Sequence, residues 1–287
     1  MLTRVLQQLK LDVLSFDEVD DSHSSTVYKC RLRTGEQVYL KIPYTKVKYD
    51  RELAAYKVLK DQVSIPDMLD FWPGDEECPG AFILSELKGR PLANTDSPAV
   101  AFQVGVLHAA MHEVRPPADM ELAGIDNEYP GWPDFVERQF TSFAEDVKEL
   151  LDGTLYNQSM ETFERMKREL PPPDGPCFLH MDFRPANIIV DGDRVSGVID
   201  FESVRFGATE IDFTKLYRDF LSFDTSLYQS YQEGYTSVRP LMDLEAVLPF
   251  YQFTDAFNSI GWCARRGIEK NAMFFDKNLS ILKSMLL

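Results

Sequence analysis

Apolar and polar residues alternate over short stretches of the first ninety positions, and this period of two is typical of β-strands. Thr34-Gly35-Glu36 separates two of these stretches and has the composition of a turn. Residues 49–60 instead have helical spacing, with Leu53, Tyr56 and Leu59 on one face. The pattern predicts a β-rich first part with one helix, and its candidate strands are residues 13–19, 26–33, 37–43 and 81–84.

The remainder of the chain has mainly helical periodicity. The predicted helices are residues 98–112, 132–151 and 159–170, with several more from residue 211 to the end. Residues 177–200 interrupt them with three apolar runs, a polar loop at 180–187 and the turn Asp191-Gly192-Asp193. Two apolar runs around such a turn predict a β-hairpin.

Composition indicates an ordinary globular chain of 287 residues, 44% apolar and 26% charged. No apolar run approaches the roughly 20 residues of a membrane span. Residues 1–11 are too polar for a signal peptide and read as a short amphipathic helix. The four cysteines have no metal-like or redox spacing. We therefore expect a cytoplasmic protein without a membrane partner.

The net charge of −16 argues against nucleic acid as a partner, because phosphate backbones attract Lys and Arg. Its distribution is uneven: residues 1–90 carry 13 basic and 15 acidic side chains, and the rest carry 17 and 31. The second part has a field that attracts a cationic ligand. Ordinary solubility charge explains the excess equally well.

The hairpin places three polar residues where phosphoryl transfer can use them. Asn187 precedes its first strand and Asp200 follows its second, so the two lie close together across its open end. An amide oxygen and a carboxylate suit Mg²⁺, a hard cation. Asp182, in the preceding loop, can accept a proton from an attacking hydroxyl. Loop hydrogen bonds and a strand cap explain each residue singly, but the three together favour a catalytic site.

Lys41 and Glu52 form a second candidate pair. Lys41 shares one face of its predicted strand with Tyr39, and Glu52 lies in the helix that follows. A strand lysine held by a helix glutamate is a required part of kinase-type catalysis. A surface lysine and a solvated glutamate are the alternative for either residue alone.

The segment His180-x-Asp182-x-x-x-x-Asn187, followed by Asp200, resembles the catalytic segment of protein-kinase-like enzymes. More narrowly, it is similar to the aminoglycoside phosphotransferase and choline kinase family, although Met181 stands where that family usually has Gly. The resemblance implies an α+β, two-lobed, protein-kinase-like fold. Residues 1–90 are then a nucleotide-binding N-lobe, with a five-stranded sheet and a helix, and residues 91–287 a mostly helical C-lobe. The hinge lies at about residues 85–91.

The same resemblance implies where the nucleotide binds. Lys41, held by Glu52, reaches the α- and β-phosphates. The loop 20–26 contains no glycine, and Ser24 and Ser25 offer hydroxyls to phosphate oxygens. The carbonyl of Ser85 and the N–H of Leu87 bond the adenine edge. ATP is the expected nucleotide, and nothing in the pattern excludes GTP.

On the catalytic side, the resemblance assigns Asp182 to the acceptor hydroxyl and Asn187 and Asp200 to one or two Mg²⁺ ions. It makes Asp212 an anchor of the catalytic loop and places His112 on a packed helix. His180 is expected to brace the loop without acting as a base. For Arg184, a phosphate contact and a salt bridge to a helix are equally plausible.

The acceptor is expected among the C-terminal helices. Asp255, Asn258 and Trp262 are three and four residues apart and thus share one helix face, which suits a hydroxylated or cationic molecule. A partly buried amphipathic helix is the alternative. Glu202 is a further candidate carboxylate near the acceptor.

These features predict a small-molecule kinase that phosphorylates a hydroxyl of a small acceptor, as a monomer or homodimer. An antibiotic phosphotransferase acting on an aminoglycoside-type acceptor and a metabolic kinase for choline, methylthioribose or homoserine are both open. A nucleotide-binding pseudokinase is the alternative from another class. A protein kinase is disfavoured, because the short stretch between Asp200 and Asp212 leaves no room for a long activation segment.

Overall fold

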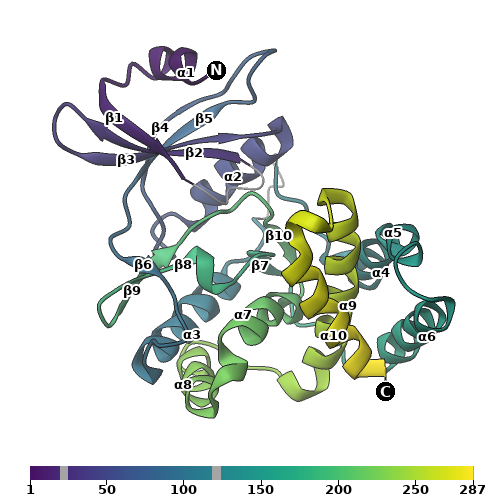
Figure 1. Cartoon of the computed structure of the whole chain (residues 1–287). Coiled ribbons are helices and arrows are strands. Elements are labelled where there is room, and N and C mark those ends of the chain that lie inside the picture. The colour runs from purple at the N-terminus through teal and green to yellow at the C-terminus, as the bar shows by residue number, and fades with distance from the viewer. Residues whose placement is uncertain (20–24, 118–123, 287) are drawn as a thin grey trace.

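The computed structural model describes residues 1–19, 25–117 and 124–286, which form a small β-rich lobe and a larger helical lobe (Figure 1). Helix α1 (Leu2–Gln8) covers the outer face of the N-lobe sheet, and α2 (Lys46–Leu59) covers the inner face. The sheet is antiparallel, in the order β1-β2-β3-β5-β4, and consists of β1 (Val13–Glu18), β2 (Ser25–Leu32), β3 (Gln37–Pro43), β4 (Met68–Trp72) and β5 (Ala81–Ser85).

The four strands predicted from the alternation of apolar and polar residues are confirmed as β1, β2, β3 and β5, and each observed end lies within two residues of the predicted end. The fifth, β4, was expected from the resemblance only. Its inner positions Leu69, Asp70 and Phe71 are all exposed, so it does not show the alternation of a half-buried strand.

The described part of the C-lobe contains the predicted hairpin and eight helices. They are α3 (Pro98–Glu113), α4 (Trp132–Ser142), α5 (Ala144–Lys148), α6 (Gly153–Glu169), α7 (Phe213–Asp219), α8 (Thr225–Thr236), α9 (Leu244–Arg266) and α10 (Ala272–Leu286). Helices α9 and α10 lie side by side (Figure 1). None of the described helices is long and apolar enough to span a bilayer.

Two helix predictions need correction. The expected helix 132–151 divides at Phe143 into α4 and α5. The expected helix 159–170 begins six residues earlier, because Asp152 caps its N-terminus by accepting a hydrogen bond from the Leu155 N–H at 2.9 Å.

The predicted hairpin is confirmed as β8 (Ile188–Asp191) and β9 (Arg194–Val198), joined through Gly192, whose φ of 58° suits a tight turn. Strand β6 (Arg90–Pro91) pairs with β8, and β7 (Cys177–Leu179) pairs with β10 (Arg205–Gly207). The Ile199 N–H donates to the Asn187 carbonyl at 2.9 Å. This bond closes the open end of the hairpin and brings Asn187 next to Asp200.

Candidate active site

A buried ion cluster joins the two lobes. The alternation of β3 turns Val38 and Leu40 toward α1 and turns Lys41 toward α2. The Lys41 ammonium lies 2.8 Å from Glu52 Oε1 on α2 and 2.6 Å from Asp200 Oδ1 after β9. The side chains of Lys41 and Glu52 are 6% and 0% exposed, so solvent screens this pair little.

The charges in this cluster depend on one another. Burial favours the neutral form of Lys41, yet the carboxylates of Asp200 and Glu52 outweigh it and raise the pKa of the ammonium. Burial also raises the pKa of Glu52, to about 7, against the opposing effect of Lys41. For Asp200 the Lys41 charge outweighs burial and lowers the pKa of the carboxyl. Lys41 is therefore held as a cation between two acidic side chains.

Asp182 lies in the catalytic loop between β7 and β8, and two cations bind its carboxylate. Oδ1 accepts a hydrogen bond from Lys215 Nζ at 2.6 Å. Oδ2 accepts from Arg184 Nε and from Asn187 Nδ2, each at 3.0 Å. Burial raises the pKa of Asp182, but Lys215 and Arg184 outweigh it and the net shift is downward. The carboxylate is thus ionised and able to accept a proton.

Neither alternative given for Arg184 describes its observed contact, which is to Asp182 two residues earlier. Sequence reasoning did not find Lys215. It lies on α7, thirty-three positions after Asp182, and a lysine on an amphipathic helix carries no local signal of such a contact.

Asn187 and Asp200 offer a donor set that fits Mg²⁺. The Asn187 amide nitrogen bonds the backbone carbonyl and the carboxylate of Asp182, which orients its oxygen away from that residue. Asp200 gives Oδ1 to Lys41, and its side chain is 32% exposed, so the carboxylate remains accessible. An amide oxygen and one or two carboxylate oxygens, with water and phosphate oxygens completing the shell, are typical Mg²⁺ ligands.

Asp212 fixes the backbone of the catalytic loop by accepting two of its N–H groups. Its Oδ2 accepts the N–H of His180 at 2.6 Å, and its Oδ1 accepts that of Met181 at 2.7 Å. His180 Nε2 lies 2.9 Å from the Ile199 carbonyl and so ties the loop to the hairpin. Met181 and Asp200 have φ values of 65° and 75°, a left-handed conformation that L-residues rarely adopt. This explains why a glycine suits the position of Met181.

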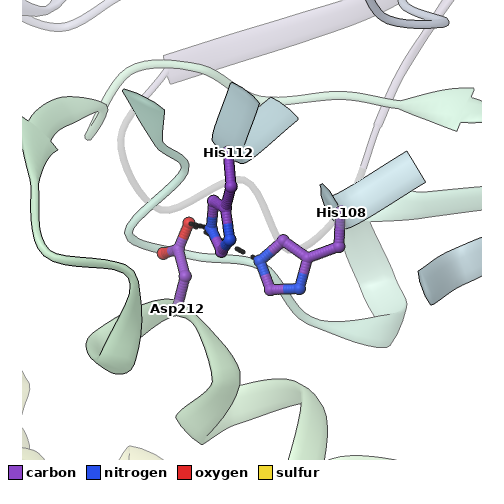
Figure 2. Close-up of side chains that lie close together, drawn as sticks. All are labelled: His108, His112 and Asp212. Carbon is purple, nitrogen blue, oxygen red and sulfur yellow. Dashed lines mark ion pairs between the residues drawn. The ribbon is translucent and has the colours of Figure 1, made fainter. Parts of the chain in front are cut away.

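Two buried histidines of α3 face Asp212 (Figure 2). His112 Nε2 and His108 Nε2 lie 3.5 and 3.9 Å from Asp212 Oδ2. On their other side, the Nδ1 atoms contact the hydroxyls of Tyr235 and Tyr231 at 2.8 and 2.7 Å. Burial lowers the pKa of His108 to about 3 and also lowers that of His112, so both rings are neutral.

These three residues are the one group among the described residues with metal-ligand spacing. Polar contacts account for the arrangement: each Nδ1 lies within hydrogen-bonding distance of a tyrosine hydroxyl, and each Nε2 faces the Asp212 carboxylate without forming a hydrogen bond. Asp212 already accepts two backbone N–H bonds, so we assign the cluster to the support of the loop. The sequence indicated His112 as a packed residue and missed His108.

The expected adenine-binding segment follows β5. The N–H and Oγ of Ser85 both bond the backbone of Asp67, at 2.9 and 2.8 Å, and Leu87 is half-buried. Of the two phosphate-loop candidates, Ser25 begins β2 and is buried, whereas Ser24 lies outside the described residues.

The expected acceptor residues lie on α9, and α7 connects them to Asp182. Arg218, three residues after Lys215 on α7, forms a salt bridge with Asp255. Trp262 packs edge-on against Phe274 of α10, and the Asn258 Oδ1 is buried without a hydrogen-bond partner. The stripe therefore faces α7 and α10.

Glu202, the further carboxylate expected near the acceptor, contacts α2. It is 6% exposed, its carboxylate lies 3.1 Å from Lys48 Nζ and its carbonyl accepts from Arg51 at 3.1 Å.

The fold and the site together define a phosphotransferase of the protein-kinase-like class. A family model described as "Phosphotransferase enzyme family" (APH) matches residues 16–247, and the chain belongs to this family. The predicted family, fold class and phosphotransferase activity are thereby confirmed. No curated protein matches the chain closely.

Several solved structures share the fold at low identity. The GDP and kanamycin complex of APH(2")-IIia superposes with a TM-score of 0.77 at 12% identity, covering 99% of this chain and 97% of that one. The macrolide 2'-phosphotransferase MphH from Brachybacterium faecium gives 0.69 at 16%, covering 98% and 96%. The ethanolamine kinase of Plasmodium vivax gives 0.67 at 15%, covering 95% and 81%.

Proposed function

We propose that this phosphotransferase moves the γ-phosphate of ATP to a hydroxyl of a small, cationic acceptor, with Asp182 as the proton-accepting residue. The observation that carries the proposal is the convergence of Asp182, Asn187 and Asp200 with Lys41 and Glu52, from both lobes. A nucleotide-binding pseudokinase does not need an ionised, oriented carboxylate beside its metal ligands.

Each residue has a separate task in this proposal. Lys41, held by Glu52, binds the α- and β-phosphates. Asn187 and Asp200 hold Mg²⁺, which supplies positive charge to the phosphate oxygens. Asp182 orients the acceptor hydroxyl and takes its proton late. Positioning and electrostatics contribute most of the acceleration, since phosphoryl transfer needs little covalent chemistry from the protein.

For the nucleotide, we propose binding between the Ser85–Leu87 segment and Lys41, with Ser24 and Ser25 near the phosphates. ATP is the expected donor. The GDP complex of APH(2")-IIia belongs to a protein of the same fold, so GTP is retained as a second candidate.

For the acceptor, we propose the region where α9 faces α7. The C-lobe as a whole favours a cation, because residues 91–287 carry 31 acidic and 17 basic side chains. The buried Asn258 Oδ1 lacks a partner and can accept a hydrogen bond from a hydroxyl or ammonium group. Asp255 and Trp262 supply a carboxylate and an aromatic face for the same ligand.

A metabolic kinase for an amino alcohol or a sugar is the second candidate. The ethanolamine kinase of Plasmodium vivax shares the fold, and its acceptor is likewise a small amine. We further propose a reducing compartment, the cytoplasm, because all four cysteines are buried free thiols. A monomer or a homodimer fits the chain.

The test is a screen for ATP and GTP consumption with Mg²⁺ against aminoglycosides, macrolides, choline-like amines and sugars. Asp182→Asn serves as the blank, because it keeps the shape of the side chain and removes its ability to accept a proton. Turnover with one acceptor class and none in the blank supports the proposal. Equal nucleotide consumption by both proteins contradicts the assignment of Asp182.

A further inference from the structure

Lys215 contacts the candidate base directly, although no motif points to it. Its Nζ donates to Asp182 Oδ1 at 2.6 Å and to the Met181 carbonyl at 3.2 Å. An ammonium has three donor hydrogens, so these two contacts leave a third. The side chain is 32% exposed and thus accessible to solvent.

The position of Lys215 is fixed by the same element that fixes the loop. Asp212, immediately before α7, bonds the backbone of His180 and Met181, and Lys215 follows it by one helical turn. Helix α7 therefore holds the loop backbone and presents the ammonium to the loop carboxylate as one unit.

The acceptor hydroxyl must approach the carboxylate that Lys215 contacts. Oδ2 of Asp182 accepts two hydrogen bonds, from Arg184 and Asn187, whereas Oδ1 accepts one, from Lys215. A carboxylate oxygen has two acceptor positions, so Oδ1 has room for the hydroxyl, which needs a distance of about 2.6–3.2 Å. Lys215 has a flexible four-carbon stem, so its ammonium can turn from Oδ1 toward the phosphoryl group.

The cation has a second anion within reach. In a near-attack arrangement the acceptor oxygen lies about 3–3.5 Å from the phosphorus. A hydroxyl bound at Oδ1 therefore places the γ-phosphoryl oxygens within a short swing of Lys215 Nζ. Lys41, by contrast, is held between Glu52 and Asp200.

We propose that Lys215 is a catalytic residue, which moves from Asp182 to the transferring γ-phosphoryl group and stabilises its negative charge. The inference rests on the proposed function and deepens it. The acceptor oxygen forms a bond to the γ-phosphorus while the bond from that phosphorus to the β-bridging oxygen breaks. The breaking bond leaves its electron pair on ADP, and the hydroxyl proton goes to Asp182. Lys215 remains an ammonium throughout and acts by charge.

The test measures nucleotide binding alone, so it does not require that the acceptor be identified first. Calorimetry measures the affinity of the whole protein for Mg-ADP with and without aluminium fluoride, which stands in for the transferring phosphoryl group. In the wild type we expect fluoroaluminate to tighten binding. Lys215→Met should reduce this gain by about 100–1,000-fold, the range for a lost transition-state contact, and leave Mg-ADP binding intact. Lys215→Arg keeps the charge and should retain part of the gain.

Lys167→Met is the matched control, since Lys167 on α6 also forms a 2.8 Å pair, with Glu137, far from the loop. It should keep the full gain. A full gain in Lys215→Met overturns the inference, as does a wild type that binds Mg-ADP without any gain. A wild type that binds no Mg-nucleotide contradicts the proposed function itself. If Lys215→Met is unfolded, Lys215→Arg is the deciding variant. If it binds Mg-ADP as tightly as the wild type but aluminium fluoride does not tighten that binding, the proposed role of the Lys215 charge is overturned.

Steady-state kinetics distinguish a catalytic role of Lys215 from a role that only supports the loop structure. With the acceptor found by the screen, Lys215→Met should lower kcat by about 100-fold and leave the KM for ATP nearly unchanged. A raised KM with an unchanged kcat contradicts the inference.

Discussion

The left-handed backbone at Met181 predicts that glycine is more stable than alanine at this position, the reverse of the usual order. Met181→Gly and Met181→Ala both remove the half-buried side chain beyond Cβ and differ only in that atom. At a φ of 65°, the Cβ costs about 1–2 kcal/mol, whereas glycine loses about 0.5–1 kcal/mol more chain entropy on folding. We therefore expect Met181→Gly to be more stable than Met181→Ala by about 0.5–1 kcal/mol.

The assay is equilibrium urea unfolding, in which the midpoint is compared at equal slope. Ala186→Gly is the control, because Ala186 is exposed in the same loop and has no positive φ. There the usual order holds, and glycine should be less stable by about 0.5–1 kcal/mol. If Met181→Ala equals or exceeds Met181→Gly, the strain argument for this loop is refuted.

Three further predictions concern the site. Asp182→Ala should abolish transfer and leave Mg-ATP affinity nearly intact; unchanged turnover would show that another group accepts the proton. Asp200→Ala should weaken nucleotide binding only when Mg²⁺ is present, so a magnesium titration identical to that of the wild type contradicts a ligand role. His108 has a folded pKa of about 3, below its unfolded value of about 6.5, and stabilises the fold above pH 6.5 but progressively less as the pH falls to 3. The double variant His108→Phe/Tyr231→Phe removes the titrating imidazole together with its hydrogen-bond partner. Its unfolding free energy should therefore fall less steeply with decreasing pH between 6.5 and 3, and the difference in slope should be about 1.4 kcal/mol per pH unit. An equal slope would place the acid sensitivity elsewhere.

Local sequence predicted the catalytic hairpin well. Asn187, the turn at Gly192 and Asp200 lie within fourteen consecutive residues, so alternation and turn chemistry were sufficient to bring their backbones together. The Lys41–Glu52 pair was predictable for a similar reason, since β3 and α2 are consecutive elements.

Contacts between distant elements were less accessible to this reasoning. The contact of Glu202 with Lys48 of α2 depends on the direction of the backbone after Asp200. The bond from Arg218 to Asp255 depends on how α7 packs on α9. Neither arrangement has a periodicity that a single sequence reveals.

The sequence by itself determined the order and spacing of the chemical groups: a lysine on a strand, a glutamate on the next helix, and an aspartate, an asparagine and a second aspartate around one hairpin. The tertiary structure decided which charges surround them. Lys215 reaches Asp182, and His108 and His112 reach Asp212, only because α7 and α3 pack beneath the catalytic loop. Spacing along the chain fixes local geometry, whereas the electrostatic field at Asp182, the candidate base, depends on helices that come together only in the folded protein.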